Sequence, residues 1–306
     1  MPSTRGIEKA PAGTFETIVG KRSLPYIFLG PALALILFLL VAPVVQGVFM
    51  SFLATRGNGA VDWVGLDNYR ILFRESRFAS NLRSSLFYLA GNLVLSAPLA
   101  YAAAALITGK HRQAEYFRGI FLLPWITAPI VSTLLFRALV DPQIGPLGIL
   151  ISRLSGRQVL ILGHPVWALV FVTVHSFWRS FPFVMLFLSA GMSMIPREVY
   201  ESAMVDGAGR WKRFTRLTLP LTSNQLAIAL LQITVWTLYD AETIYAFTNG
   251  GPGYATETLA VRLFKSAFIN FDLNTSAVIG IILISLSIVF MAVYMRLVGS
   301  GGGDAQ

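Results

Sequence analysis

Polar and aromatic side chains recur at helical spacing inside a long apolar run over residues 223–247. Gln232, Trp236, Tyr239 and Thr243 stand at i, i+4, i+7 and i+11, with Asp240 beside them. Sugars present apolar C–H faces that stack on aromatic rings, and their hydroxyls need hydrogen-bond partners. The stripe therefore suits the wall of a path for a sugar-like solute. The alternative interpretation is structural, because Trp and Tyr near the ends of membrane spans are often interface anchors.

A second apolar run, over residues 165–192, contributes His175, Trp178 and Arg179 to the same hypothesis. Ionisable side chains at membrane depth are costly and usually face the interior of a helix bundle. We therefore expect Arg179 and Asp240 to face inward, where their charges could neutralise each other. In the alternative interpretation, the two charges only lock neighbouring helices together.

Enzymatic chemistry has little support in the sequence. Gly109-Lys110 is followed by His111 and lacks the earlier glycine of a phosphate-binding loop. The three histidines, His111, His164 and His175, have no metal-ligand spacing, and no serine nucleophile elbow is present. The absence of Cys excludes thiolate metal sites and Cys nucleophiles. We therefore expect neither catalysis nor a metal or cofactor in this chain, and energy must come from another subunit.

The composition places the chain in a membrane. Of its 306 residues, 55% are hydrophobic and 13% are charged, and the mean hydropathy is +0.65. An average soluble domain carries about 25% charged residues and could not bury this much apolar surface. The net charge of +9 could suggest nucleic acid, but the basic residues fall between the apolar runs and form no single basic face. Lipid is the expected surrounding, and nucleic acid is not an expected partner.

Six apolar runs are long enough to cross ~30 Å of hydrocarbon, which takes ~20 helical residues. Prolines inside several runs are interpreted as kinks, because neighbouring helices and waters in a bundle can satisfy the freed carbonyls. The sequence therefore predicts an all-α polytopic membrane protein with six transmembrane helices. We expect an N-terminal segment over residues 1–25, a transmembrane domain over 26–298 and a flexible Gly-rich tail over 299–306. The spans are expected at about 26–52, 85–107, 117–140, 165–192, 223–247 and 274–298.

Six spans place both termini on one side of the membrane. The excess of Lys and Arg in cytoplasmic loops gives only a thin margin over the whole chain. The loop over residues 193–222 is densely basic, however, and the opposing Arg excess lies in one segment, residues 53–84, that we interpret as a folded or interfacial arm. We therefore expect both termini in the cytoplasm.

The loop over residues 193–222 has the features of two short helices joined by a bend. Pro196 suits the first turn of a helix, Glu198 favours its positive N-terminal end, and Gly207 tolerates the positive φ that ends a helix. A second helix should follow, with apolar residues at i, i+3 and i+6 from Trp211. Such an elbow can insert into a groove on another protein and carry rigid-body motion back to the spans on either side.

The same loop resembles the EAA loop of binding-protein-dependent ABC importer permeases. The pattern of that loop is Glu-Ala-Ala, three residues, Gly, nine residues, Ile, one residue and Leu-Pro. Ser202 and Leu217 are mild departures from it, and Asp206-Gly207-Ala208 is similar to the maltose-type carbohydrate branch in particular. The positions that match at the spacing of the family are Glu201, Ala203, Gly207, Leu219 and Pro220.

Similarity to the carbohydrate branch extends over nearly the whole chain from about residue 26. Thr248-Asn249-Gly250-Gly251-Pro252 resembles a late outward loop of that branch, and the resemblance implies contact with a binding protein at Asn249, Gly250, Gly251 and Pro252. A simple turn is the alternative interpretation of such a cluster. The turn after Gly145 departs from the branch, because Gly148 stands where Asn is common.

The resemblance implies the type I ABC importer permease fold and transport by alternating access. It implies a heterodimer with a second permease subunit, two ABC ATPase subunits that bind ATP and Mg²⁺ and grip one elbow each, and an extracytoplasmic solute-binding protein. The expected location is the bacterial cytoplasmic (inner) membrane, in contact with membrane lipid. The coupling residues that it implies are Glu201, Ala203, Asp206, Gly207, Leu219 and Pro220.

Two other functions stay open on the sequence. An ion-coupled secondary sugar transporter could use Asp240 and Glu242 as ion sites without any ATPase, although we detect no internal repeats of the kind such carriers often have. A membrane scaffold or receptor would need no polar path at all. The solute is also open among sugars, sugar oligomers, glycerol phosphodiesters and polyols, and an anionic solute would need a basic residue in the path such as Arg179.

Overall fold

The computed structural model describes residues 24–55, 59–108 and 112–301. These residues are mostly helical, and the chain divides into two compact units over residues 1–49 and 50–306. Residues 1–23 of the expected N-terminal segment and residues 302–306 of the expected tail lie outside the described residues.

The first unit contains a continuous apolar helical segment. Helix α1 (Leu24–Ile36) passes through the π-helical turn η1 (Leu37–Val41) into α2 (Ala42–Ser51), with Pro31 inside α1. From Leu29 to Ser51 the segment is long and apolar enough to cross a membrane, and its large apolar side chains are exposed. A helix that is apolar on every side and long enough to cross the hydrocarbon suits a lipid environment.

The second unit begins with a small hairpin and continues as helices. Strands β1 (Leu53–Thr55) and β2 (Val61–Trp63) are antiparallel, with Leu53 opposite Trp63. The helices that follow are α3 (Asp67–Arg74), α4 (Ser76–Ile107), α5 (Arg112–Ile126), α6 (Pro129–Leu139), α7 (Pro146–Ser155), η2 (Ile161–Gly163), α8 (Pro165–Met194), α9 (Arg197–Val205), α10 (Arg210–Arg213), η3 (Phe214–Thr218), α11 (Leu219–Leu221), α12 (Ser223–Leu238), α13 (Glu242–Thr248), α14 (Leu259–Phe268) and α15 (Leu273–Gly301).

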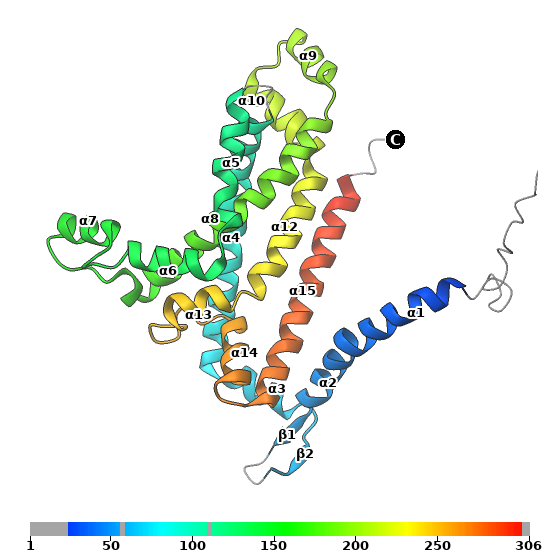
Figure 1. The fold of residues 1–306 in the computed structure, drawn as a ribbon, viewed down its shortest axis with the longest axis vertical. Helices are drawn as coiled ribbons and strands as arrows, with labels where there is room; N and C mark the ends of the chain where they lie inside the picture. The colour runs from blue at the N-terminus through cyan, green and yellow to red at the C-terminus, as the bar shows by residue number, and fades with distance from the viewer. Residues whose placement is uncertain (1–23, 56–58, 109–111, 302–306) are drawn as a thin grey trace, which may run out of the picture. The chain divides into compact units, whose positions relative to one another are not determined.

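Helices α4, α8 and α12 form the packed centre of this unit, as Figure 1 shows, with α5 against α4 and α8 and α15 against α12. Small residues allow the close approach of α4 and α8: a Cβ on Gly91 would lie 2.5 Å from Cγ2 of Thr173. The largest buried cluster joins α4, α8 and α12 through Ala100, Tyr101, Ala103, Ala104, Ile107, Phe181, Val184, Met185, Leu188, Met192, Ala229 and Ile233.

Four helices in the described ranges are long and apolar enough to cross a membrane, namely Leu29–Ser51, Ser76–Ile107, Pro165–Met194 and Leu273–Arg296. They correspond to four of the six expected spans, although α4 begins nine residues before the expected 85 and α15 continues to Gly301, inside the expected tail. The other two expected spans are interrupted. The count of six therefore stays a prediction.

The run expected as a span over 117–140 bends by 94° between its two helices, Ala114–Ile126 and Pro129–Leu139. Pro129 opens α6, and Ala128 before it is extended, at ψ 134°, because proline disfavours the α conformation in the preceding residue. The run over 223–247 is also divided. Helix α12 ends at Leu238, and α13 begins at Glu242.

Candidate functional site

The elbow, residues 195–222 between α8 and α12, projects beyond the ends of these two helices (Figure 1). Helix α9 begins directly after Pro196 and ends before Gly207, whose φ of +74° lies in the left-handed region that glycine adopts without steric cost. The backbone N–H of Ala208 donates to the carbonyl oxygen of Ala203 at 2.8 Å and closes the turn. The two expected helices and the bend between them are confirmed.

The tip of the elbow is exposed. Val205 is 88% exposed and Trp211 76%, which is unusual for apolar side chains of this size. Of the expected coupling residues, Ala203 is half-buried, and the others are exposed: Glu201, Asp206, Gly207, Leu219 and Pro220. An exposed apolar tip with charged neighbours is a surface on which another protein can dock.

The base of the elbow is anchored to the helix bundle. The hydroxyls of Tyr200 and Thr218 are 3.0 Å apart, which ties α9 to η3. Tyr101 of α4 packs edge-on against Phe214 at a ring-centroid distance of 5.4 Å, and its hydroxyl is 3.0 Å from Oγ1 of Thr222. The rings of Trp211 and Phe214 lie on the same side, with centroids 5.8 Å apart, as the spacing predicts, although Trp211 is exposed and Phe214 packs against α4.

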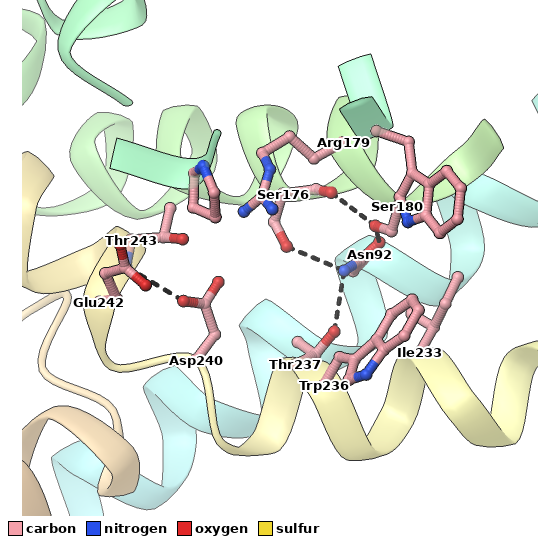
Figure 2. A pocket seen from close by; sticks show the side chains of 12 residues that line it. Asn92, Ser176, Arg179, Ser180, Ile233, Trp236, Thr237, Asp240, Glu242 and Thr243 are labelled. Atoms are coloured by element: carbon pink, nitrogen blue, oxygen red, sulfur yellow. Dashed lines mark hydrogen bonds between the residues drawn. The ribbon is translucent and has the colours of Figure 1, made fainter. Parts of the chain in front are cut away.

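A cavity of about 320 Å³ lies between α4, α5, α6, α8, α12 and α13. Figure 2 shows the side chains that face it. Two indole rings, of Trp125 and Trp236, contribute apolar area, and polar groups occupy the remainder of the wall. The lining residues are Asn92, Trp125, Pro129, Ser176, Arg179, Ser180, Ile233, Trp236, Thr237, Asp240, Glu242 and Thr243.

Asn92 of α4 organises the polar wall of the cavity. Its Nδ2 donates to Oγ of Ser176 and to Oγ1 of Thr237, each at 2.9 Å, and its Oδ1 accepts from Ser180 Oγ at 2.8 Å and Ser96 Oγ at 2.9 Å. One amide therefore links α4, α8 and α12, as the dashed lines in Figure 2 show for three of these bonds. Polar groups within apolar helices must be satisfied inside the protein in this way.

The charged residues of the cavity wall are Arg179, Asp240 and Glu242, and Figure 2 shows Arg179 and Asp240 facing the same space from α8 and the α12–α13 link. Within the described part of the chain, Arg179 and Asp240 do not form the expected ion pair. Asp240 Oδ2 accepts instead from the hydroxyl of Tyr88 at 2.8 Å, and Oδ1 accepts from the backbone N–H of Thr243 at 3.1 Å. That second bond stabilises the first turn of α13, which accounts for the break after Leu238.

Two buried polar atoms at the cavity wall have no hydrogen-bond partner among the described residues: Nε of Arg179 and Oγ1 of Thr243. Buried polar groups are normally paired, so each unpaired one is a candidate contact for a ligand.

The structure divides the eight expected path residues into two groups. Trp236, Asp240, Thr243 and Arg179 line the cavity, whereas Gln232, Tyr239, His175 and Trp178 do not. His175 is buried between Phe136 and Phe247, with Nε2 3.0 Å from Oγ of Ser132, and Trp178 packs on Phe136. The stripe from Gln232 to Thr243 is not continuous, because α12 ends at Leu238 and α13 begins at Glu242.

The Gly-Gly-Pro segment forms a tight turn. Asn249 and Gly250 have φ of +52° and +81°, and Oγ1 of Thr256 donates to the carbonyl oxygen of Gly251 at 2.8 Å. A Cβ on Gly250 would lie 3.0 Å from Cβ of Glu257, so this turn packs closely on that residue. The turn expected as the structural alternative is therefore present, and contact of Asn249, Gly250, Gly251 and Pro252 with a binding protein stays a prediction.

Glu257, beneath this turn, is completely buried and holds a cluster of charges. Arg77 donates to both carboxylate oxygens, at 2.8 and 2.9 Å, Asn81 Nδ2 donates at 3.0 Å, and Lys265 Nζ is 3.3 Å away. A second ion pair joins Arg262 to Glu75, and Arg262 also donates to Oδ1 of Asn81. Arg77, which belongs to the Arg excess in residues 53–84, is thus paired with a buried carboxylate, which weakens its value as a topology signal.

The surroundings of Glu257 lower the pKa of its carboxyl below the ordinary value of 4.5. Burial alone would raise this pKa, but hydrogen bonds from Arg77 and Asn81 and the charges of Arg77 and Lys265 outweigh burial.

The sequence pattern of the family described as "Binding-protein-dependent transport system inner membrane component" matches residues 96–299, which contain the elbow and most of the cavity wall. The chain belongs to this family. It is therefore a multi-pass inner-membrane permease of an ABC importer, which favours this function over the ion-coupled carrier.

Curated relatives resemble the permease over most of its length. SmoG, a permease of the sulfoquinovosyl glycerol transport system of Agrobacterium fabrum, is 28% identical over 286 residues, which are 92% of each chain. MalF, from the trehalose/maltose transport system of Thermococcus litoralis, is 29% identical over 277 residues, 89% of this permease and 92% of MalF.

Solved structures share the fold. A chain of a bacterial ABC transporter involved in import of the acidic polysaccharide alginate has a TM-score of 0.76 at 21% identity, covering 94% of this permease and 98% of that chain. A chain of the bacterial alginate transporter in complex with its alginate pentasaccharide-bound periplasmic protein also has a TM-score of 0.76, at 20% identity, covering 92% and 95% of the two chains.

Sequence reasoning missed Asn92, Ser176, Ser180 and Thr237 as cavity residues. Ser176 and Ser180 stand four residues apart, as do Asn92 and Ser96, and such polar pairs inside apolar runs were an available signal.

We predict that Glu257→Gln lowers the free energy of unfolding of the permease by about 3 kcal/mol, because it removes the buried carboxylate that pairs with the half-buried Arg77 and Lys265. Since the folded pKa of Glu257 is depressed, its contribution is complete above the unfolded pKa near 4.5 and is lost as pH falls through the folded pKa. Denaturant unfolding of the purified permease across this acidic range measures both effects. The matched control is Asp67→Asn, which breaks an exposed pair with Arg70 and should cost less than about 1 kcal/mol. Equal losses in the two variants would contradict the prediction.

Proposed function

We propose that this permease forms part of the translocation path of an ATP-driven importer for a sugar or sugar-like solute and works by alternating access. The observation that carries the proposal is that α8 and α12 both line the cavity and both end in the same exposed elbow. A movement imposed on the elbow would therefore be transmitted to the cavity walls that carry Arg179 and Trp236.

The cavity wall supports a polyhydroxylated solute. Trp125 and Trp236 offer rings for the C–H face of a sugar, and the polar side chains of Arg179, Asp240 and Glu242 on the same wall offer hydrogen-bond partners for its hydroxyls. The two curated relatives described above belong to systems for sulfoquinovosyl glycerol and for trehalose and maltose, which supports the same class. We therefore assign the path to Arg179, Trp236, Asp240 and Thr243.

We propose that the elbow docks in a groove of an ABC ATPase subunit. In this arrangement Glu201 and Asp206 accept hydrogen bonds from the ATPase, Ala203 allows close approach, Gly207 forms the bend, and Leu219 and Pro220 connect it to α12. Two such ATPase subunits bind the ATP and Mg²⁺, and their closure rotates the elbow. The exposed tip and anchored base of the elbow support this role.

The proposed assembly also contains a second, related permease subunit and an extracytoplasmic solute-binding protein. The family description, which names binding-protein dependence, supports the latter partner. We propose that Asn249, Gly250, Gly251 and Pro252 meet this binding protein, as part of a turn held rigid from below by Glu257.

We propose six membrane crossings with both termini in the cytoplasm. The crossings would be α1–α2, α4, the bent pair α5–α6, α8, the broken pair α12–α13, and α15. The elbow between α8 and α12 would then be cytoplasmic, and the end of α2 and the beginnings of α4 and α15 would lie on the outer side.

We predict that Gly207→Val uncouples ATP hydrolysis from uptake or loses the ATPase during purification, because a β-branched residue is strained at φ +74°. The matched control is Gly209→Val, whose backbone φ is −62°. A Cβ has open space at both positions, so steric contact does not distinguish them. Solute-stimulated ATPase activity and uptake by the reconstituted importer measure the effect, and normal coupling in Gly207→Val would contradict the assignment.

We predict that Trp236→Ala raises the solute concentration for half-maximal uptake roughly three- to ten-fold, the loss expected when one ring contact is removed. Gln232→Ala is the control, because Gln232 stands one turn away on α12 and does not line the cavity. Uptake should be measured at matched expression. If both variants behave alike, Trp236 is not part of the path.

A further inference from the structure

Hairpin β1–β2 and helix α3, described over residues 53–55 and 59–74 and here called the arm, are fixed to the end of one apolar span and the beginning of another. Asn68 Nδ2 donates to the carbonyl oxygens of Ser51 and Leu53, at 2.9 and 2.8 Å, and the hydroxyl of Tyr69 donates to Oγ of Ser51 at 2.8 Å. Ser51 is the last residue of α2, and α4 begins at Ser76, directly after α3.

The arm is also fixed to the beginning of α15. Asn274 Nδ2 donates to the carbonyl oxygen of Leu53 at 2.6 Å, and Oγ1 of Thr55 donates to Oδ1 of Asn274 at 2.9 Å. On the inner face of α3, buried Leu72 packs with Val278 and Ile279 of α15. The ends of three membrane-length apolar helices thus meet at the arm, which places it at a boundary of the membrane.

The outer face of the arm combines apolar and basic side chains. Trp63 is 66% exposed, although one face of its indole stacks on Phe52, and Ile71 and Phe73 are also mostly exposed. Arg70 and Arg74 lie one helical turn apart.

Both arginines are exposed. Arg70 pairs only with its exposed neighbour Asp67, at 2.8 Å, and Arg74 makes no hydrogen bond or ion pair with the described residues. Aromatic and aliphatic side chains beside exposed arginines are typical of segments that lie in the headgroup region of a bilayer.

We propose that the arm is a binding surface for anionic phospholipid, in which Arg70 and Arg74 contact headgroup phosphates while Trp63, Ile71 and Phe73 enter the boundary of the acyl chains. The arm is held at the ends of three apolar spans by the chain itself and by hydrogen bonds. This position favours lipid over a protein partner, since lipid headgroups surround the protein at the membrane boundary. The exposed guanidinium groups of Arg70 and Arg74 complement the phosphates of anionic headgroups. The arm would thereby fix the height of α4 and α15 in the membrane.

The first test measures the depth of the arm. Because the chain contains no Cys, a nitroxide on Phe73→Cys reports this position alone. The full chain is reconstituted in vesicles of phosphatidylglycerol and phosphatidylcholine, and collision of the label with lipid-soluble oxygen is compared with collision with a water-soluble nickel chelate. Labels on Leu39→Cys, in the exposed apolar segment, and on Val205→Cys, at the tip of the elbow, serve as lipid and water references.

We predict a depth for the Phe73 label between the two references, at the level of the headgroups. Nickel access equal to that at Val205 would place the arm in water, and exclusion of both reagents would mean that protein covers it. Either result would overturn the proposal.

The second test concerns the charge of the lipid. Arg70→Gln combined with Arg74→Gln should reduce the phosphatidylglycerol retained by the purified chain, measured by mass spectrometry, by roughly five-fold per removed charge. The matched control, Arg153→Gln with Arg157→Gln, removes two exposed positive charges from α7 and the loop after it and should retain the lipid. Equal loss from both pairs, or no loss from the arm pair, would contradict specific binding, and equal unfolding temperatures of the two double variants check that both are folded.

Discussion

The left-handed backbone of Gly207 allows α9 to end and the chain to turn back toward α12, and the rest of the coupling geometry depends on this bend. Helices α8 and α12 leave the elbow side by side and then line one cavity with Arg179 and Trp236. Between the elbow and the cavity they are packed together with α4 through a buried apolar cluster. Close-packed interiors transmit strain and do not absorb it, so a displacement at the elbow has a physical route to the cavity.

A second constraint is the need to satisfy polar groups inside an apolar bundle. Asn92 meets it by bonding to α8 and α12, and Asp240 meets it by accepting from Tyr88 and from the first turn of α13. Near the start of α4, Arg77 and Asn81 donate hydrogen bonds to the buried carboxylate of Glu257. Against this background the unpaired Nε of Arg179, a residue of the cavity wall, is an exception among the described residues.

Much of this architecture could be predicted from local sequence patterns. The bend at Gly207 and the start of α9 after Pro196 follow from residue preferences that act within a few positions, and the membrane class follows from composition. The breaks at Pro129 and at Asp240 were harder to predict, because a proline in an apolar run is compatible with either a kink or a sharp bend, and Asp240 ends a helix through a bond to Thr243 that competes with continued helix.

The cavity was only half predicted because it depends on how helices pack. His175 and Trp178 have the chemistry of path residues, but they are used in an aromatic cluster with Phe136, whereas Asn92, in a helix where no path residue was expected, is central to the cavity wall. Helical spacing shows which residues share one face of a helix, but it does not show which helix packs against that face. The packing decides whether the face meets a cavity or another side chain.

The central claim, that the elbow moves the cavity, can be tested by the reactivity of one introduced thiol. Glu242 is exposed at the cavity wall, and the chain has no Cys, so Glu242→Cys introduces a single thiol there. The rate at which a membrane-impermeant maleimide labels this thiol, measured on this chain after gel separation, reports access to the cavity. In the assembled importer, addition of ATP should change this rate about ten-fold when Gly207 is intact and leave it unchanged in the Gly207→Val background. An ATP-dependent change of the same size in both backgrounds would contradict transmission through the elbow.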